Sequence, residues 1–211
     1  MGKNRERKSG VNIAVFASGN GSNFEAIAQA VKKRKIRANL ALLVSDNPTA
    51  FVLKRARKYK IRIAIVRRED FFTKKDFEAG ILSCLKVHGI DLIVLAGFMR
   101  VLSPEFVRRY RNKILNIHPS LLPAFKGAHG IRDAFDYGVK VSGVTVHFVD
   151  EQMDHGPIVL QEPLVIEERD TLAELEARIH KVEHCIYPEA IKLFTERKLK
   201  AGKRKVKILF R

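Results

Sequence analysis

Hydrophobic and polar positions form blocks along the chain that predict strands and helices in turn. The short apolar runs expected to form buried strands are residues 11–17, 40–44, 63–66, 91–96 and 114–118. Helical spacing of apolar residues predicts helices at 24–34, 50–59 and 74–88, and Ser103-Pro104 has the residues that begin a short helix. Strands that alternate with helices predict a parallel, doubly wound sheet.

The pattern changes after residue 118. A loop at 121–130 and a helix at 131–137 precede two longer β runs at 142–149 and 157–166, and a long amphipathic helix follows at 171–196. The short connection between the two β runs predicts an antiparallel pair. The fold class is therefore α/β: a Rossmann-like, doubly wound, mostly parallel sheet with a C-terminal antiparallel strand pair and helices on both faces. In such sheets ligands bind beyond the carboxyl ends of the strands, here just after Ala17, Ala96 and Ile117.

The composition fits a chain with one sizeable core. It has 211 residues, of which 46% are hydrophobic, and no apolar run reaches the roughly 18–20 residues that span a bilayer. The polar, basic N-terminus does not resemble a signal peptide, so we expect a cytoplasmic protein with no membrane partner. Cys84 and Cys185 imply no disulfide framework and are expected to be reduced.

The net charge of +17 is concentrated near the two ends. Residues 1–10 hold four Lys or Arg and one Glu, whereas residues 197–211 hold eight Lys or Arg and no acid. We expect a basic arm at 1–10, a main domain at 11–200 and a basic tail at 201–211. Such arms suit solubility better than nucleic-acid binding, because stacking aromatics are not interleaved with the charges.

The glycine turn after the first strand, Gly19-Asn20-Gly21-Ser22-Asn23, opens the first helix. Free amides at a helix N-terminus favour an anion, and glycine permits close approach. Phe24 occupies the place of the third glycine of a dinucleotide fingerprint, so the turn indicates one phosphate. A plain strand–helix turn explains this segment equally well.

The richest chemistry lies in Asn116-Ile117-His118 at the end of an apolar strand. Asn116 and His118 point to the same face, so an amide donor and an imidazole can serve one reacting carbonyl. A carboxylate from the acidic loop at 150–157, such as Asp154, could orient the histidine. Spacing alone does not show that Asp154 reaches His118.

Six motifs in order resemble the phosphoribosylglycinamide formyltransferases, the folate-dependent enzymes of purine synthesis. They are Ser18-Gly-Asn-Gly-Ser-Asn23, Leu95-Ala-Gly-Phe-Met-Arg100, Leu115-Asn-Ile-His-Pro-Ser-Leu-Leu-Pro123, Val144-Thr-Val-His-Phe-Val-Asp150, Asp154-His-Gly-Pro157 and Glu183-His-Cys-Ile-Tyr-Pro188. The resemblance extends from about Val11 to Lys200.

The resemblance implies transfer of the formyl group of 10-formyltetrahydrofolate to the amine of glycinamide ribonucleotide, without a metal. Its implied catalytic residues are Asn116, His118 and Asp154. The implied substrate-binding residues are Gly21, Ser22, Asn23, His180 and Glu183. The implied folate-binding residues are Lys74, Met99, Arg100, Val101, Leu102 and Asp150.

Two positions depart from the family pattern. His155 stands where Gly or Thr is commoner, and His180 stands where a glutamine often meets the substrate phosphate. The histidine would make that contact pH-dependent. Oligomeric state, a homodimer included, and the isomer of the Leu122-Pro123 bond stay open.

Other functions share some of these sequence features. Methionyl-tRNA formyltransferase and formyltetrahydrofolate hydrolase have related catalytic domains. Each also carries an extra domain, and the residues outside 11–200 are expected to be too few to form one. A nucleic-acid binding protein would draw on the basic ends. The spacing His180-Lys-Val-Glu-His184 resembles a metal motif, but no third ligand is apparent. His88, His129 and His147 show no pattern beyond packing or local hydrogen bonding.

Overall fold

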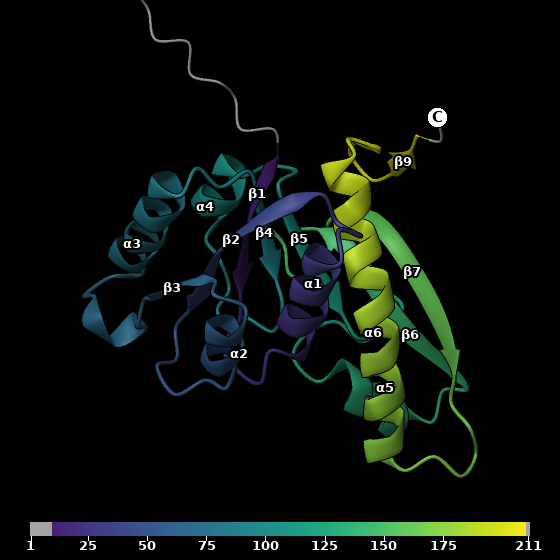
Figure 1. The fold of residues 1–211 in the computed structure, drawn as a ribbon. Coiled ribbons are helices and arrows are strands. Elements are labelled where there is room, and N and C mark those ends of the chain that lie inside the picture. The colour runs from purple at the N-terminus through teal and green to yellow at the C-terminus, as the bar shows by residue number, and fades with distance from the viewer. Residues whose placement is uncertain (1–9, 210–211) are drawn as a thin grey trace, which may run out of the picture.

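The structure is a computed structural model that describes residues 10–209, and its centre is a seven-stranded sheet in the order β3-β2-β1-β4-β5-β6-β7 (Figure 1). The strands are β1 Val11–Phe16, β2 Ala38–Ser45, β3 Arg62–Ile65, β4 Leu92–Leu95, β5 Ile114–His118, β6 Val141–Phe148 and β7 Ile158–Val165. β1 to β5 pair in parallel, whereas β6 pairs antiparallel with both β5 and β7. The predicted fold class is confirmed.

Helices cover both faces of this sheet. They are α1 Ser22–Lys32, α2 Val52–Lys58, α3 Lys74–Val87, α4 Pro104–Arg109, α5 Gly130–Tyr137 and α6 Leu172–Thr195, with a short 3-10 helix η1 at Arg68–Asp70. The Ser103 hydroxyl caps α4, and Thr171 forms a capping box with Glu174 at the start of α6. These caps explain why both helices begin where the sequence predicts.

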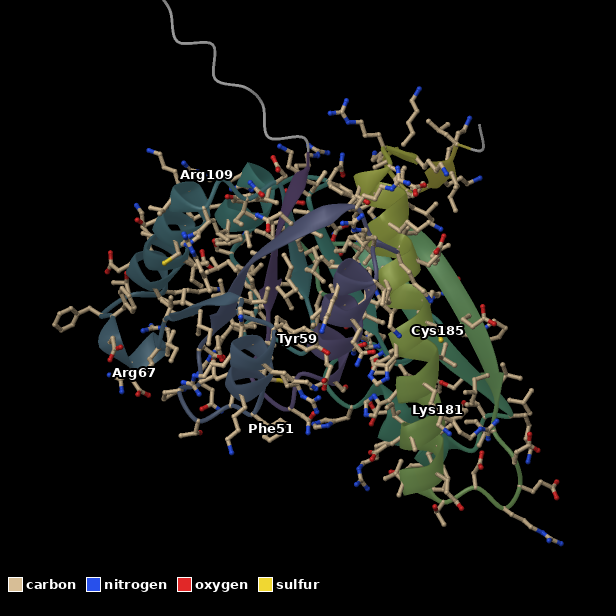
Figure 2. The ribbon with its side chains drawn as sticks, in the orientation of Figure 1. Phe51, Tyr59, Arg67, Arg109, Lys181 and Cys185 are labelled. Atoms are coloured by element: carbon tan, nitrogen blue, oxygen red, sulfur yellow. The ribbon has the colours of Figure 1, made fainter. Side chains whose placement is uncertain are left out.

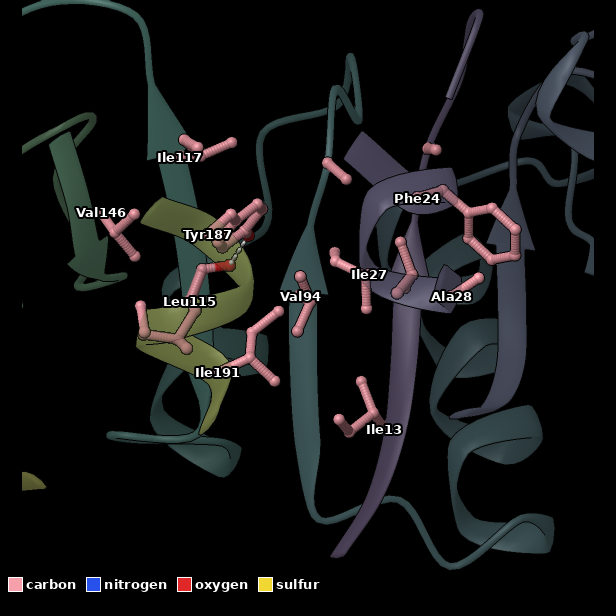
Figure 3. Packing of buried hydrophobic residues seen from close by; sticks show 14 of the residues in the cluster. Ile13, Phe24, Ile27, Ala28, Val94, Leu115, Ile117, Val146, Tyr187 and Ile191 are labelled. Carbon is pink, nitrogen blue, oxygen red and sulfur yellow. Dashed lines mark hydrogen bonds between the residues drawn. The ribbon is translucent and has the colours of Figure 1, made fainter. Parts of the chain in front are cut away.

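Two apolar layers hold the helices against the sheet. One layer joins the sheet to α1, α2 and α6, and the other joins it to α3 and α4. Figure 3 shows Tyr187 of α6 reaching into the first layer. Its hydroxyl lies 2.7 Å from the carbonyl of Leu95, the last residue of β4, and 3.0 Å from the Leu115 carbonyl in β5, so it ties α6 to both strands.

The C-terminal residues form a hairpin that the sequence pattern did not indicate. Its strands are β8 Leu199–Ala201 and β9 Val206–Ile208, which pair antiparallel. Lys205 also forms a single parallel bridge with Ile158, the first residue of β7. Much of the expected basic tail is therefore folded, while residues 1–9 and 210–211 lie outside the described residues.

Smaller features complete the fold. The Leu122-Pro123 peptide bond is cis. Cys84 and Cys185 are free thiols, and Cys185 lies exposed on α6 (Figure 2). No helix within residues 10–209 is long and apolar enough to cross a membrane.

Candidate functional site

The chemistry-bearing segments meet at one edge of the sheet, where the strand order reverses between β1 and β4. From β1 the chain proceeds outward to β2 and β3, then returns to β4 and β5 on the other side. The Ser18 amide donates to the Gly97 carbonyl at 3.0 Å, which joins the segments that follow β1 and β4. Ligands of doubly wound folds bind in the crevice at this reversal, which is the edge of the sheet where the sequence predicts the site.

Asn116, His118 and Asp154 lie together at the end of β5. Asp154 Oδ2 is 3.5 Å from His118 Nδ1, and Asp154 Oδ1 is 3.5 Å from Asn116 Nδ2. His118 is almost fully buried, whereas Asn116 is half-buried and faces the edge of the crevice. The structure therefore brings together the three residues that spacing alone could not connect.

Both ring nitrogens of His118 have a defined neighbour. Nε2 lies 2.8 Å from the Phe125 carbonyl oxygen, which can only accept, so Nε2 carries a proton. Nδ1 faces the Asp154 carboxylate. A neutral ring would present a lone pair to that carboxylate, whereas a protonated ring forms an ion pair with it. The Asp154 carboxylate is therefore placed to accept from Nδ1 when the ring carries a second proton.

Asp154 is held from both its backbone and its side chain. Its φ of 47° lies in the left-handed region, which Asp tolerates better than most residues. The Gly127 amide donates to Oδ2 at 2.9 Å. Burial alone would raise the pKa of Asp154. The contact with His147, the Gly127 amide and the charge of His118 outweigh burial and lower that pKa below its usual value.

His147 belongs to this group, although it was expected only to pack or to form local hydrogen bonds; its place in the Val144–Asp150 motif was the sequence signal for it. It is buried on β6 directly opposite Asn116 in the antiparallel pairing. Its Nε2 lies 3.2 Å from Asn116 Nδ2 and 3.7 Å from Asp154 Oδ1. The register of β5 against β6 brings it to Asn116, and register is not readable from one strand.

The glycine turn has the geometry of an anion site. Gly21 adopts a φ of 75° as the N-cap of α1, and no side chain caps that end of the helix. A Cβ at Gly21 would lie 2.3 Å from a Val52 methyl group, so glycine is required for space as well as for φ. The first amides of α1, at Ser22 and Asn23, are thus available to a phosphate.

α6 closes over this turn. Glu183, nearly buried, accepts from Asn23 Nδ2 at 2.9 Å and lies 2.9 Å from His180 Nδ1. His180 and His184 stack with ring centroids 6.5 Å apart. Within the described part of the chain, buried Asn23 Oδ1 and His184 Nε2 have no hydrogen-bond partner. A cavity of about 610 Å³ between α1 and α6 is bordered by Ser22 and His184.

The residues expected to bind folate follow β4 and lie on neighbouring elements. Met99 and Val101 are exposed, whereas Leu102 is buried in the apolar layer shared with α3 and α4. Arg100 Nε donates to Asp46 at 2.6 Å, and Asp46 accepts from Ser18 at 2.5 Å.

Lys74 and Asp150 lie on either side of that segment in the chain. Lys74 starts α3 and is 3.9 Å from Glu78, which binds the Ser103 amide at 2.7 Å. Asp150 is 2.7 Å from His155 Nδ1 and accepts from the Gln152 amide. Lys74 is thereby placed beside the end of the Met99–Leu102 segment, and Asp150 shares its loop with Asp154.

His180 and His184 do not belong to a metal-binding cluster among residues 10–209. Across residues 10–209, no group of three or more His, Cys, Asp or Glu side chains is arranged to hold a metal ion. Glu183 instead bridges His180 and Asn23.

Comparison with known proteins matches residues 11–191 to the family model described as formyl transferase. The chain belongs to the formyl transferase family. It is 50% identical to the phosphoribosylglycinamide formyltransferase of Bacillus subtilis over 85% of this chain and 92% of that protein. It is 39% identical to the enzyme of the same name from Escherichia coli over 90% of each chain.

Solved structures agree with this family membership. The glycinamide ribonucleotide transformylase 1 of Symbiobacterium toebii superposes with a TM-score of 0.94 at 40% identity, over 99% of each chain. The corresponding protein of Geobacillus kaustophilus superposes at 0.86 with 45% identity, over 88% of this chain and 98% of that one. The formyl transferase fold therefore includes the crevice at which Asn116, His118 and Asp154 meet.

Proposed function

We propose that this formyl transferase moves the formyl group of 10-formyltetrahydrofolate to the amine of glycinamide ribonucleotide. The observation that carries the proposal is the contact group of Asn116, His118 and Asp154 beside an uncapped helix N-terminus. A formyl acceptor that bears a phosphate needs both parts: donors for the reacting carbonyl and an anchor for the phosphate.

The group suits acyl transfer. The substrate amine attacks the formyl carbon, a C–N bond forms, and the carbonyl oxygen becomes an oxyanion. An Asn116 N–H donates to that oxyanion, and the positive charge of His118 stabilises it. When the intermediate collapses, the bond from the formyl carbon to folate breaks, and the folate nitrogen takes up the proton that the amine loses.

Asp154 keeps His118 charged and oriented during this sequence. A direct proton relay through His118 Nε2 first requires release from the Phe125 carbonyl. Gly130 lies over the same ring, because a Cβ there would sit 3.1 Å from Nε2. The loop from Phe125 to Gly130 therefore controls access to His118. The electrostatic role of His118 does not require this loop to move.

The remaining residues position the two substrates. Gly21, Ser22 and Asn23 offer the amides that bind the phosphate, with His180 as a further donor and Glu183 as an acceptor for the substrate. Lys74 supplies positive charge for the acidic tail of the folate. Arg100, paired with Asp46, belongs to the wall of the folate site. Met99, Val101 and Leu102 form its apolar wall, and Asp150 lies in the loop expected against the pterin ring.

Formyl transfer by purified protein with glycinamide ribonucleotide and 10-formyltetrahydrofolate tests this proposal. We expect transfer by the wild type and a loss of about 100-fold or more in His118→Ala and Asp154→Asn. Asn tolerates the left-handed backbone at position 154, so this variant removes charge without forcing the turn to change. Asp136→Asn, on the exposed face of α5, is the matched control.

Each outcome separates one part of the proposal from another. Folate binding without transfer to this amine would retain formyl chemistry and redirect the search to another acceptor. Absence of folate binding would contradict the enzyme assignment. A cytoplasmic location, a homodimer and the lack of a nucleic-acid partner stay predictions from the sequence.

A further inference from the structure

The loop between β6 and β7 carries Asp154 but has little packing of its own. Glu151, Gln152 and Met153 are exposed, and Asp154 adopts the left-handed conformation. The Phe148 amide donates to the Pro157 carbonyl at 2.9 Å, which closes the base of the loop. The part of the loop that holds the carboxylate therefore needs support from elsewhere.

The Gly127 amide supports Asp154 itself, and the C-terminal hairpin supports the residue next to it. Arg204, in the turn between β8 and β9, donates through Nη1 to the carbonyl oxygen of His155. The same nitrogen lies 3.4 Å from Nδ1 and 3.3 Å from Nε2 of the His155 ring, so the guanidinium packs against the imidazole. His155 in turn contacts Asp150 at 2.7 Å. One arginine thus holds the residue next to Asp154 and, through its ring, Asp150.

The hairpin is firm enough to act as a support. Leu199, Ala201 and Val206 pack against the core layer that includes α6. The Gly202 amide donates to the Lys205 carbonyl at 2.8 Å and closes the turn that presents Arg204. The bridge between Lys205 and Ile158 joins this turn to the start of β7. Figure 2 shows nitrogen-tipped side chains gathered around the hairpin at the end of α6.

We propose that Arg204 is a positioning residue for the formyl transfer reaction, acting through His155 to place Asp154 and Asp150. The proposal rests on the proposed function of the Asp154 site. Arginine suits this role because its planar head donates to a carbonyl and stacks on a ring at once, and it stays charged across the working pH range. The basic C-terminus thereby gains a specific role beside its net charge.

Steady-state kinetics of Arg204→Ala, Arg204→Lys and Lys203→Ala test the proposal. Displacement of a catalytic group by about 1 Å from a remote change can cost on the order of 100-fold. We expect Arg204→Ala to lower kcat about 10- to 100-fold and raise the KM for folate, with the KM for glycinamide ribonucleotide unchanged. Arg204→Lys should recover part of kcat, because lysine retains one donor for the His155 carbonyl.

Lys203→Ala is the matched control, since it removes the same charge from the same exposed turn and Lys203 has no hydrogen bond or ion pair to any residue within 10–209. Kinetics of Arg204→Ala within twofold of Lys203→Ala would overturn the proposal. So would an equal rise in both KM values with a matching drop in melting temperature, which a merely structural role would produce.

Hydrogen exchange at residues 150–156 provides a second measurement that needs no turnover. We expect faster exchange in Arg204→Ala than in Lys203→Ala, confined to this loop. If the wild type fails to transfer the formyl group, the proposed function fails, yet this comparison still decides whether Arg204 holds the loop. Identical exchange in the two variants would refute the positioning role by itself.

Discussion

Asn116 and His147 face each other across the β5–β6 pair, with Nδ2 of Asn116 3.2 Å from Nε2 of His147. His147 Nδ1 lies 2.9 Å from the Phe148 carbonyl and must donate to it, which leaves Nε2 as the ring atom that faces the Asn116 amide. This contact fixes the amide with its nitrogen toward Asp154. The second N–H of the Asn116 amide makes only a 3.5 Å contact with Asp154 Oδ1. A substrate oxyanion can take the place of that contact.

Loss of the His147 ring nitrogen should therefore disorder the proposed oxyanion donor. We expect His147→Phe to lower kcat roughly 10-fold or more, since a buried donor left without its partner costs about 1–3 kcal/mol. The measurement is kcat alongside the melting temperature. His88→Phe, at the end of α3, controls for the same replacement away from the crevice. An unchanged kcat in folded His147→Phe would show that Asn116 does not depend on this ring.

Gly156 has no room for a side chain. A Cβ there would lie 1.8 Å from the Phe148 carbonyl oxygen, so the loop that carries Asp154 would have to open at its base. We expect Gly156→Ala to reduce the free energy of unfolding by about 1–3 kcal/mol, measured by urea denaturation. Gly10→Ala, where a Cβ meets nothing within 4 Å, should leave it unchanged. Equal midpoints for the two variants would contradict the close approach.

The elements were predictable from the sequence because their signals are local. The apolar runs, the Ser103 cap and the shared face of Asn116 and His118 depend only on periodicity and neighbouring residues. The role of His147 depends on antiparallel register, and the reach of Asp154 depends on a left-handed residue inside a loop. Both features depend on tertiary structure, so the periodicity of the sequence does not reveal them.

The C-terminal hairpin illustrates a different limit. Its strands are three residues each, and the charged residues between and around them dominate the composition. Charge runs of this kind usually indicate a solvated segment. Here the alternation of Leu199 with Ala201, both packed against the core, is too short to stand out until the partner strand is known.

Tyr187 should stabilise the sheet at the place where the site begins. Burial raises the pKa of its hydroxyl well above the usual value, so the group stays a neutral donor to the Leu95 and Leu115 carbonyls. Tyr187→Phe removes this donor from two buried acceptors. We expect a loss of about 1–2 kcal/mol in the free energy of unfolding, measured by urea denaturation at pH 7. Tyr137 is exposed on α5, so Tyr137→Phe should leave the free energy of unfolding unchanged. Equal free energies of unfolding in the two variants would contradict a stabilising role for the Tyr187 hydroxyl.

His180 introduces a titratable group beside the proposed phosphate site. The hydrogen bond with Glu183 raises the pKa of His180; burial opposes this, and the charges of Glu183 and Glu176 add to it. Burial and the charges of neighbouring His180 and Arg55 lower the pKa of His184, despite the nearby charge of Glu183. The two stacked rings therefore differ in basicity, and His180 takes up a proton more readily than His184.

Because the folded pKa of His180 is raised, its stabilising charge is fully present below about pH 6.5 and is lost as the pH rises through the folded value. Phosphate binding should follow the same direction. We expect the KM for glycinamide ribonucleotide to rise several-fold from pH 6.5 to 8.5 in the wild type. His180→Gln keeps a donor without a titratable charge, so its KM should rise less over that range. The remote His88→Gln should retain the wild-type profile, because His88 lies at the end of α3 and its replacement leaves the phosphate site unchanged. Parallel profiles in His180→Gln and the wild type would show that His180 does not contact the phosphate.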